Sequence, residues 1–180
     1  MAILPIRTFG DPVLRQRARE VDEVTDVHRR FVADMVETMR EAPGVGLAGP
    51  QVGVLERVFV YEVEGRQGAL FNPVIVSRSD ETVTGEEGCL SIPGLAYDVE
   101  RHASVAVEGL DENGRPVSID AGDDDFLARV FQHEIDHLDG VLFLDRLPDE
   151  LRKKAMRTLR EQLLGLPDPV PVTVPREEAL

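Results

Sequence analysis

The stretch QHEIDHL, residues 132–138, decides how this chain of 180 residues is interpreted. Apolar residues around it recur with the period of a helix, so a helix is predicted from about residue 123 to Gly140. Side chains four positions apart lie on one helical face, and the imidazoles of His133 and His137 can therefore reach one cation. Glu134 lies near enough to hydrogen-bond a water on that cation. The alternative is that both histidines are ordinary polar residues on a half-buried helix.

A catalytic metal site needs a third protein ligand and a position left open for water. No histidine follows His137, but upstream the only cysteine, Cys89, stands in EEGCLSIPG at residues 86–94. We expect Cys89 to be the third ligand. Two other interpretations are a buried inert thiol and a nucleophile, although a nucleophile would lose its free thiolate on binding metal. A single cysteine excludes an internal disulfide and any multi-cysteine zinc or iron–sulfur site.

A glycine-rich segment, GVGLAGPQVG at residues 44–53, precedes both of these motifs. No Lys-Ser/Thr follows as in a P-loop, and a predicted helix rather than a strand precedes it, which argues against a dinucleotide fingerprint. We interpret the segment as a loop whose bare backbone approaches a ligand closely, with Gln51 offering an amide donor. A plain helix-to-strand connection fits this segment equally well by itself.

The other predicted elements indicate an α+β fold. A first helix is expected over residues 26–40, with an apolar face formed by Val27, Phe31, Met35 and Met39 and with Val32 and Val36 beside them. Short strands are expected at residues 57–63, 69–77, 81–85, 104–109 and 116–119. Asn113-Gly114 marks a hairpin turn between the last two strands. We expect antiparallel strands packed around the central helix that carries the HEIDH motif.

The C-terminal part is predicted to contain a third helix at about residues 149–164 and a Pro-rich, extended or mobile tail at residues 166–180. Residues 1–165 are then expected to form a single catalytic domain.

The composition restricts the classes of partner. There are 20 Lys and Arg residues against 34 Asp and Glu, a net charge of −14, which opposes binding of DNA. No apolar run approaches the roughly 18 residues of a membrane-spanning helix. The start, MAILPIR, does not have the pattern of a secretory signal, and a reducing cytoplasm is the expected compartment.

Taken together, the three motifs resemble the peptide deformylase family. That family is marked by G-x-G-L-A-x-x-Q, E-G-C-L-S and Q-H-E-x-D-H, in this order. Here they stand at residues 44–51, 87–91 and 132–137 with every fixed position present, and the likeness extends from about Pro5 to Pro148. The resemblance implies a peptide-deformylase-like fold. It also implies an Fe(II) hydrolase that removes the formyl group from the N-formyl-methionine of newly made polypeptides and releases formate.

The resemblance further implies roles for single residues. The metal ligands would be Cys89, His133 and His137. The catalytic groups would be the Glu134 carboxylate and two donors to the formyl oxygen, Gln51 and the backbone N–H of Leu90. The substrate groove would be lined by Val45, Gly46 and Gly88.

Several alternatives stay open at this point. Two histidines and one cysteine also accommodate Zn, Ni or Co. Asp136 either orients an imidazole or belongs to a solvated helix face, and Arg101 matches a family arginine that supports the cysteine loop. The basic helix at 149–164, on which Lys153, Arg157 and Arg160 share a face, either docks on the ribosome or is an ordinary solvated surface. Other functions to be considered are an HExxH-type metallopeptidase and a catalytically silent metal- or peptide-binding homologue.

Overall fold

The computed structural model describes residues 2–122 and 125–165, which divide into two compact units, one as far as Leu147 and one from Pro148 on. The second unit contains helix α3 (Asp149–Leu163), at the position predicted. The predicted tail at 166–180 lies outside the described residues, and the extent of the catalytic domain, residues 1–165, stays a prediction. Within the described ranges, no helix is long and apolar enough to cross a lipid bilayer.

The first unit contains a five-stranded antiparallel sheet in the order β1-β2-β3-β6-β7. Its strands are β1 (Gly46–Ala48), β2 (Val58–Val63), β3 (Arg66–Arg78), β6 (Val105–Leu110) and β7 (Pro116–Asp120). The last four confirm predicted strands, and the turn with Gly114 at φ +74° joins β6 to β7 as the Asn-Gly pair predicted. The structure adds β1, which occupies part of the segment expected to be a loop.

Strand β2 is buried on both faces of this sheet, and its side chains alternate between them. In β2, Phe59 and Tyr61 pack into one apolar cluster, which includes Phe131 of helix α2 (Asp125–Leu138). Val58 and Val60 face the other way, into a cluster with residues of helix α1 (Asp26–Glu41). The sheet is therefore a central layer between the two helices.

One detail of the predicted apolar face of α1 is wrong. Met35 and Met39 are fully buried, but Val27 is 64% exposed. A spacing of four residues turns a helix about 40° too far at each step, so three such steps move a side chain by about 120°. Val32, which was predicted beside this face and lies three residues before Met35, is buried with it.

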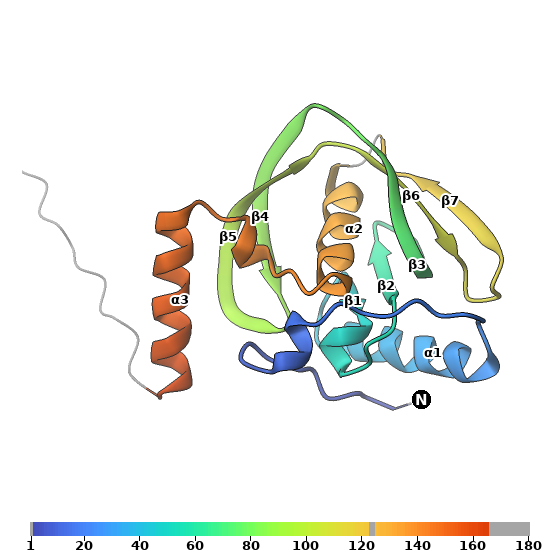
Figure 1. Cartoon of the computed structure of the whole chain (residues 1–180), viewed down its shortest axis with the longest axis horizontal. Helices are drawn as coiled ribbons and strands as arrows, with labels where there is room; N and C mark the ends of the chain where they lie inside the picture. The colour runs from blue at the N-terminus through green and yellow to red at the C-terminus, as the bar shows by residue number, and fades with distance from the viewer. Residues whose placement is uncertain (1, 123–124, 166–180) are drawn as a thin grey trace, which may run out of the picture. The chain divides into compact units, whose positions relative to one another are not determined.

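A second, two-stranded sheet is formed by β4 (Thr82–Cys89) and β5 (Ile92–His102), which pair antiparallel. The strand predicted at 81–85 extends to Cys89, and β5 is not predicted from the sequence. Helix α2 lies between this pair and the larger sheet, in contact with β1, β2 and β5 (Figure 1). The expected arrangement of antiparallel strands around a central motif-bearing helix is confirmed.

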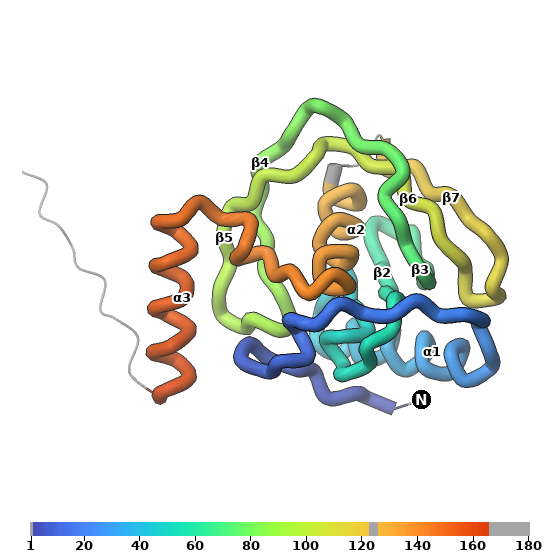
Figure 2. The backbone as a smooth tube through the Cα atoms, viewed as in Figure 1, coloured from blue at the N-terminus to red at the C-terminus, as the bar shows by residue number. Residues whose placement is uncertain are grey.

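The C-terminal end of α2 is held by the N-terminal part of the chain. The blue segment in Figure 2 passes this end, where the Ala18 N–H donates to the carbonyl of Leu138 at 2.8 Å. Gly140 follows with φ +74°, and an added Cβ there would lie 2.8 Å from the backbone of Arg15. A glycine is therefore needed both for the left-handed turn and for the close approach.

Candidate metal centre and catalytic pocket

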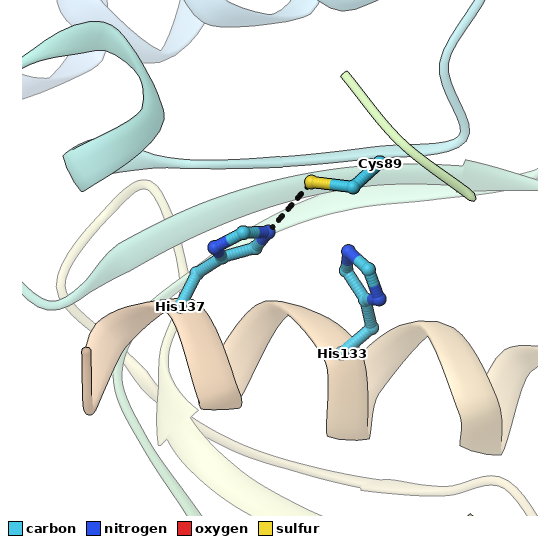
Figure 3. Close-up of side chains that lie close together, drawn as sticks. All are labelled: Cys89, His133 and His137. Atoms are coloured by element: carbon cyan, nitrogen blue, oxygen red, sulfur yellow. Dashed lines mark hydrogen bonds between the residues drawn. The ribbon is translucent and has the colours of Figure 1, made fainter. Parts of the chain in front are cut away.

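Helix α2 directs His133 and His137 toward Cys89, which ends strand β4 (Figure 3). The Cys89 Sγ lies 3.2 Å from Nε2 of His137. One potential ligand atom from each of the three residues lies within 4.8 Å of the other two. The structure thus brings together the three residues that the sequence predicted to be metal ligands, from segments more than 40 positions apart.

A break in strand register brings the thiol to this position. Pairing of β4 with β5 shifts between Gly88 and Cys89, so Cys89 is opposite Ile92. Such irregularities turn a strand and redirect its side chains, and they are frequent beside functional sites.

The donor set fits a divalent cation. Burial by itself would raise the pKa of the Cys89 thiol, but the charge of His137 and hydrogen bonds from both imidazoles lower it well below the usual value. Burial would likewise lower the pKa of His133, yet hydrogen bonds with Cys89 and Glu87 raise it well above the usual value. The thiolate is thus stabilised by positive charge beside it. A bound cation would supply that charge in place of protons.

Glu87 orients the His133 ring. Its Oε2 lies 3.0 Å from Nδ1 of His133, which leaves Nε2 of that ring for a ligand. Arg101 donates to both carboxylate oxygens at 2.8 and 2.9 Å, and Arg129 donates at 2.9 Å. Burial opposes ionisation of Glu87, but hydrogen bonds from Arg101 and His133, with their charges, lower its pKa to about 2. The carboxylate is therefore a fixed, charged support for the imidazole.

Asp136 has a different partner from the one considered from the sequence. It is buried and accepts a hydrogen bond from Arg101 at 2.6 Å and a bidentate pair from Arg146. The carboxylate bonded to His133 is that of Glu87. Asp136 extends the same network, and Arg101 supports the cysteine-bearing strand through Glu87.

Glu134 lies at the wall of the pocket with only 3% of its surface exposed. Burial raises the pKa of this carboxyl group to about 7, against the lowering effect of the two histidines. Its Oε2 has no hydrogen-bond partner within the described residues. A carboxyl group that titrates near neutrality beside an open cavity is suited to accept and return a proton.

Gln51 presents its amide N–H to the same site. Its Oε1 accepts the Ala48 N–H at 2.8 Å, which fixes the orientation of the amide. Its Nε2 then lies 3.3 Å from Ser91 Oγ and 3.6 Å from Cys89 Sγ. The N–H group that the sequence led us to expect as a donor to a ligand is thus turned toward Cys89 and Ser91.

These side chains surround a cavity of about 600 Å³. One wall is formed by the segment leading into β1, and the other by the β4–β5 hairpin. Eight of the predicted site residues line it: Val45, Gly46, Gln51, Gly88, Cys89, Leu90, His133 and Glu134. His137 lies beside them and is 1% exposed.

Sequence reasoning missed the supporting role of Glu87 and all of the role of Arg129. Glu87 was within a quoted motif, and its place two residues before Cys89 was the available signal. No sequence signal pointed to Arg129. Besides Glu87, it donates to the backbone carbonyls of Val83, Gly85 and Val99, which belong to two strands, and one of these strands was not predicted.

Comparisons with known proteins agree with this geometry. The family model described as Polypeptide deformylase matches residues 3–178. A peptide deformylase of Acidothermus cellulolyticus is 53% identical over 161 residues, covering 89% of this chain and 88% of that protein. The crystal structure of peptide deformylase from Thermus thermophilus superposes with a TM-score of 0.84 at 47% identity, covering 91% and 96% of the two chains. That of the Ehrlichia chaffeensis enzyme in complex with actinonin gives 0.83 at 39% identity, covering 90% and 98%.

Proposed function

Because the chain belongs to the peptide deformylase family, we propose that the cavity between β1 and the β4–β5 hairpin is its active site. The chain is a hydrolase that removes the formyl group from the N-terminus of nascent peptides. The observation that carries the assignment of the site is the convergence of Cys89, His133 and His137 beside the carboxylate of Glu134.

In this proposal, Cys89, His133 and His137 hold one divalent metal. When bound, such a cation lowers the pKa of water to about 7 and so supplies a hydroxide-like nucleophile at neutral pH. The thiolate cancels one unit of the positive charge. The resemblance favours Fe(II) as the metal in the cell, and metal analysis after anaerobic purification tests this choice against Zn, Ni and Co.

Glu134 accepts the proton of the attacking water and later gives it to the departing amine nitrogen. The carbon–nitrogen bond of the formyl amide then breaks, and formate and a free amino terminus result. The raised pKa of Glu134, about 7, supports this role, because a group that titrates near the working pH can both take and return a proton.

Gln51 Nε2 and the backbone N–H of Leu90 would donate to the formyl oxygen as it becomes negative. Gln51 is supported by the orientation of its amide. Leu90 is supported by its place in the cavity lining next to Cys89.

The peptide itself is proposed to pair with strand β1. This strand is at the edge of the five-stranded sheet, and Val45 and Gly46 line the cavity. An extended peptide can add to such an edge through main-chain hydrogen bonds, which do not depend on its side chains. Gly88, on the opposite wall, leaves room for it.

Release of formate from formyl-Met-Ala-Ser tests the reaction. We expect activity in the wild-type protein and a loss of about 10²–10⁴ in kcat in Glu134→Ala. The variant should keep its metal, because Glu134 is not one of the three ligands. Equal activity in the two proteins contradicts the role assigned to Glu134, and cleavage of an unformylated protein would instead indicate a metallopeptidase.

The substrates are new polypeptides, so we propose that the enzyme works in the cytoplasm and docks weakly on the ribosome through α3. Lys153 and Arg157 of this helix are exposed. We expect Lys153→Glu/Arg157→Glu to reduce co-sedimentation with ribosomes. The matched control is Arg30→Glu/Arg66→Glu, which makes the same change in charge at two other exposed positions. Unchanged, salt-insensitive co-sedimentation of the first variant would eliminate docking through α3.

A further inference from the structure

Gly46 of strand β1 lies directly against the carboxyl group of Glu134. A Cβ added at Gly46 would lie 2.3 Å from Oε1, 2.8 Å from Cδ and 3.0 Å from Cγ of Glu134. Side-chain carbons are not found so close to other heavy atoms, so one of the two groups would have to move. The end of the Glu134 side chain therefore occupies the space where any other residue at position 46 would place its side chain.

The backbone gives no other reason for a glycine here. Gly46 is not among the residues with positive φ, and it pairs regularly with Tyr61 across β1 and β2. An alanine would adopt this extended conformation without strain. The three heavy atoms nearest to such a Cβ all belong to Glu134, so this contact is the steric reason for a glycine that the structure gives.

The contact also fixes the carboxylate, because little else does. Oε2 of Glu134 has no hydrogen-bond partner in the described part of the chain, and the side chain is almost fully buried. Its position is thus set by packing between α2, from which it extends, and the bare Cα of Gly46. We propose that Gly46 is a positioning residue for the reaction, whose missing side chain holds the Glu134 carboxylate where it exchanges protons with water and amine. This inference rests on the proposed role of Glu134.

Two other glycines of the cavity walls, Gly44 and Gly88, differ from Gly46. A Cβ at Gly44 would meet the Cδ1 of Leu90 at 2.7 Å, an apolar methyl group that takes no part in proton transfer. A Cβ at Gly88 would come no closer than 3.7 Å to the Leu95 carbonyl, an ordinary contact. Gly88→Ala is therefore a matched control, since it adds the same methyl group to the opposite wall of the same cavity.

The test is a double-mutant cycle of Gly46→Ala with Glu134→Ala, in which kcat, KM, metal content and Tm are measured for the four proteins. We expect Gly46→Ala to lower kcat about 100-fold, since a displacement of about 1 Å at a reacting group has that effect. KM and metal content should change little. In the Glu134→Ala background, the same methyl group should change kcat less than about threefold, because the carboxylate it displaces is absent.

The Tm of the same proteins gives a second measurement, which is informative even where Gly46→Ala folds poorly. Overpacking should lower Tm by about 2–10 °C in the Glu134 background. This loss should disappear with Glu134→Ala, since the methyl then fills vacated space. The control Gly88→Ala should affect KM alike in both backgrounds and show no coupling in Tm.

Equal losses of kcat from Gly46→Ala in both backgrounds would overturn the proposal and assign the effect to peptide binding. An unchanged kcat in Gly46→Ala would overturn it as well. If Glu134→Ala alone kept full activity, the proposed role of Glu134 would fail. The coupling in Tm would then still report whether the two residues are in steric contact.

Discussion

The two faces of helix α2 differ in how their buried polar groups are satisfied. On the pocket face, formed by His133, Glu134 and His137, the Glu134 Oε2 and the His137 Nδ1 have no hydrogen-bond partner among the described residues. On the rear face, Asp136 is bonded to two arginines, and the amide of Gln132 is bonded to both backbone groups of His102. The rear face borders a separate cavity of about 500 Å³.

This difference distinguishes residues that are proposed to take part in the reaction from residues that hold the structure in place. Buried polar atoms in proteins are nearly always paired, so the unpaired Oε2 of Glu134 at the cavity wall fits a position kept for a ligand or a reaction. The paired groups of the rear face and of Glu87 fix the helix and the strands instead. Changes on the pocket face should therefore reduce turnover with the fold intact, and changes in the supporting network should reduce metal affinity or stability.

After Glu134→Ala, the largest effect on the pocket side is expected for Gln51→Ala. Removal of one donor to a developing oxyanion usually costs about 10²–10³ in kcat. Metal content should stay unchanged, because Gln51 is not one of the three proposed ligands. Steady-state formate release together with metal analysis measures both quantities.

Gln132→Ala is the matched change on the rear face, where the same amide side chain bonds the backbone of His102. It should lower Tm and leave kcat largely unchanged. A comparable loss of kcat in both variants would show that the two faces do not differ in the way proposed.

The pH dependence of stability should reveal the support given by Glu87. Its pKa is about 2 in the folded chain, against an ordinary value of 4.5. Above pH 4.5 the ionised carboxylate favours the folded state fully, and this contribution is lost as the pH falls from 4.5 toward 2. The difference corresponds to roughly 3 kcal/mol.

Urea unfolding of the metal-free protein between about pH 5 and pH 3 measures this slope, and Glu87→Gln is the comparison. The variant should be less stable at the upper end of this range, because Arg101 and Arg129 lose a buried partner, and its stability should depend less on pH. Identical slopes in the two proteins would mean that Glu87 is not held ionised by this network.

Most of the fold, and the grouping of most candidate site residues around one cavity, could be predicted from the sequence for identifiable physical reasons. The pocket residues belong to short contiguous motifs, and helical periodicity places two of the proposed ligands on one face of a helix. Strand β5 was missed because it has polar residues at many positions, and only Ile92, Val99 and Arg101 are buried. Its sheet is held to α2 by Arg129 and the Glu87 network, whose members meet only in three dimensions.

A smaller effect is expected for metal affinity in Glu87→Gln. The amide keeps the shape of the carboxylate but not its charge, so it holds the His133 ring less firmly and lowers its basicity. Loss of such an outer partner typically weakens metal binding about 10–100-fold. Competition with a chromophoric chelator, with Co(II) as the probe metal, measures the change. An unchanged affinity for Co(II) would show that the hydrogen bond between Glu87 and His133 does not contribute to metal binding.

The smallest effect is expected at the solvent end of the same network. The Arg146 side chain is 48% exposed and pairs with Asp136, which keeps a second, buried partner in Arg101. Exposed ion pairs contribute about 1 kcal/mol or less, so Arg146→Ala should lower the free energy of unfolding by no more than that. It should leave kcat and metal affinity unchanged, because Arg101 still connects Asp136 to Glu87. A loss of turnover in this variant, with the fold intact, would show that the support of His133 depends on the whole chain of charges out to the surface.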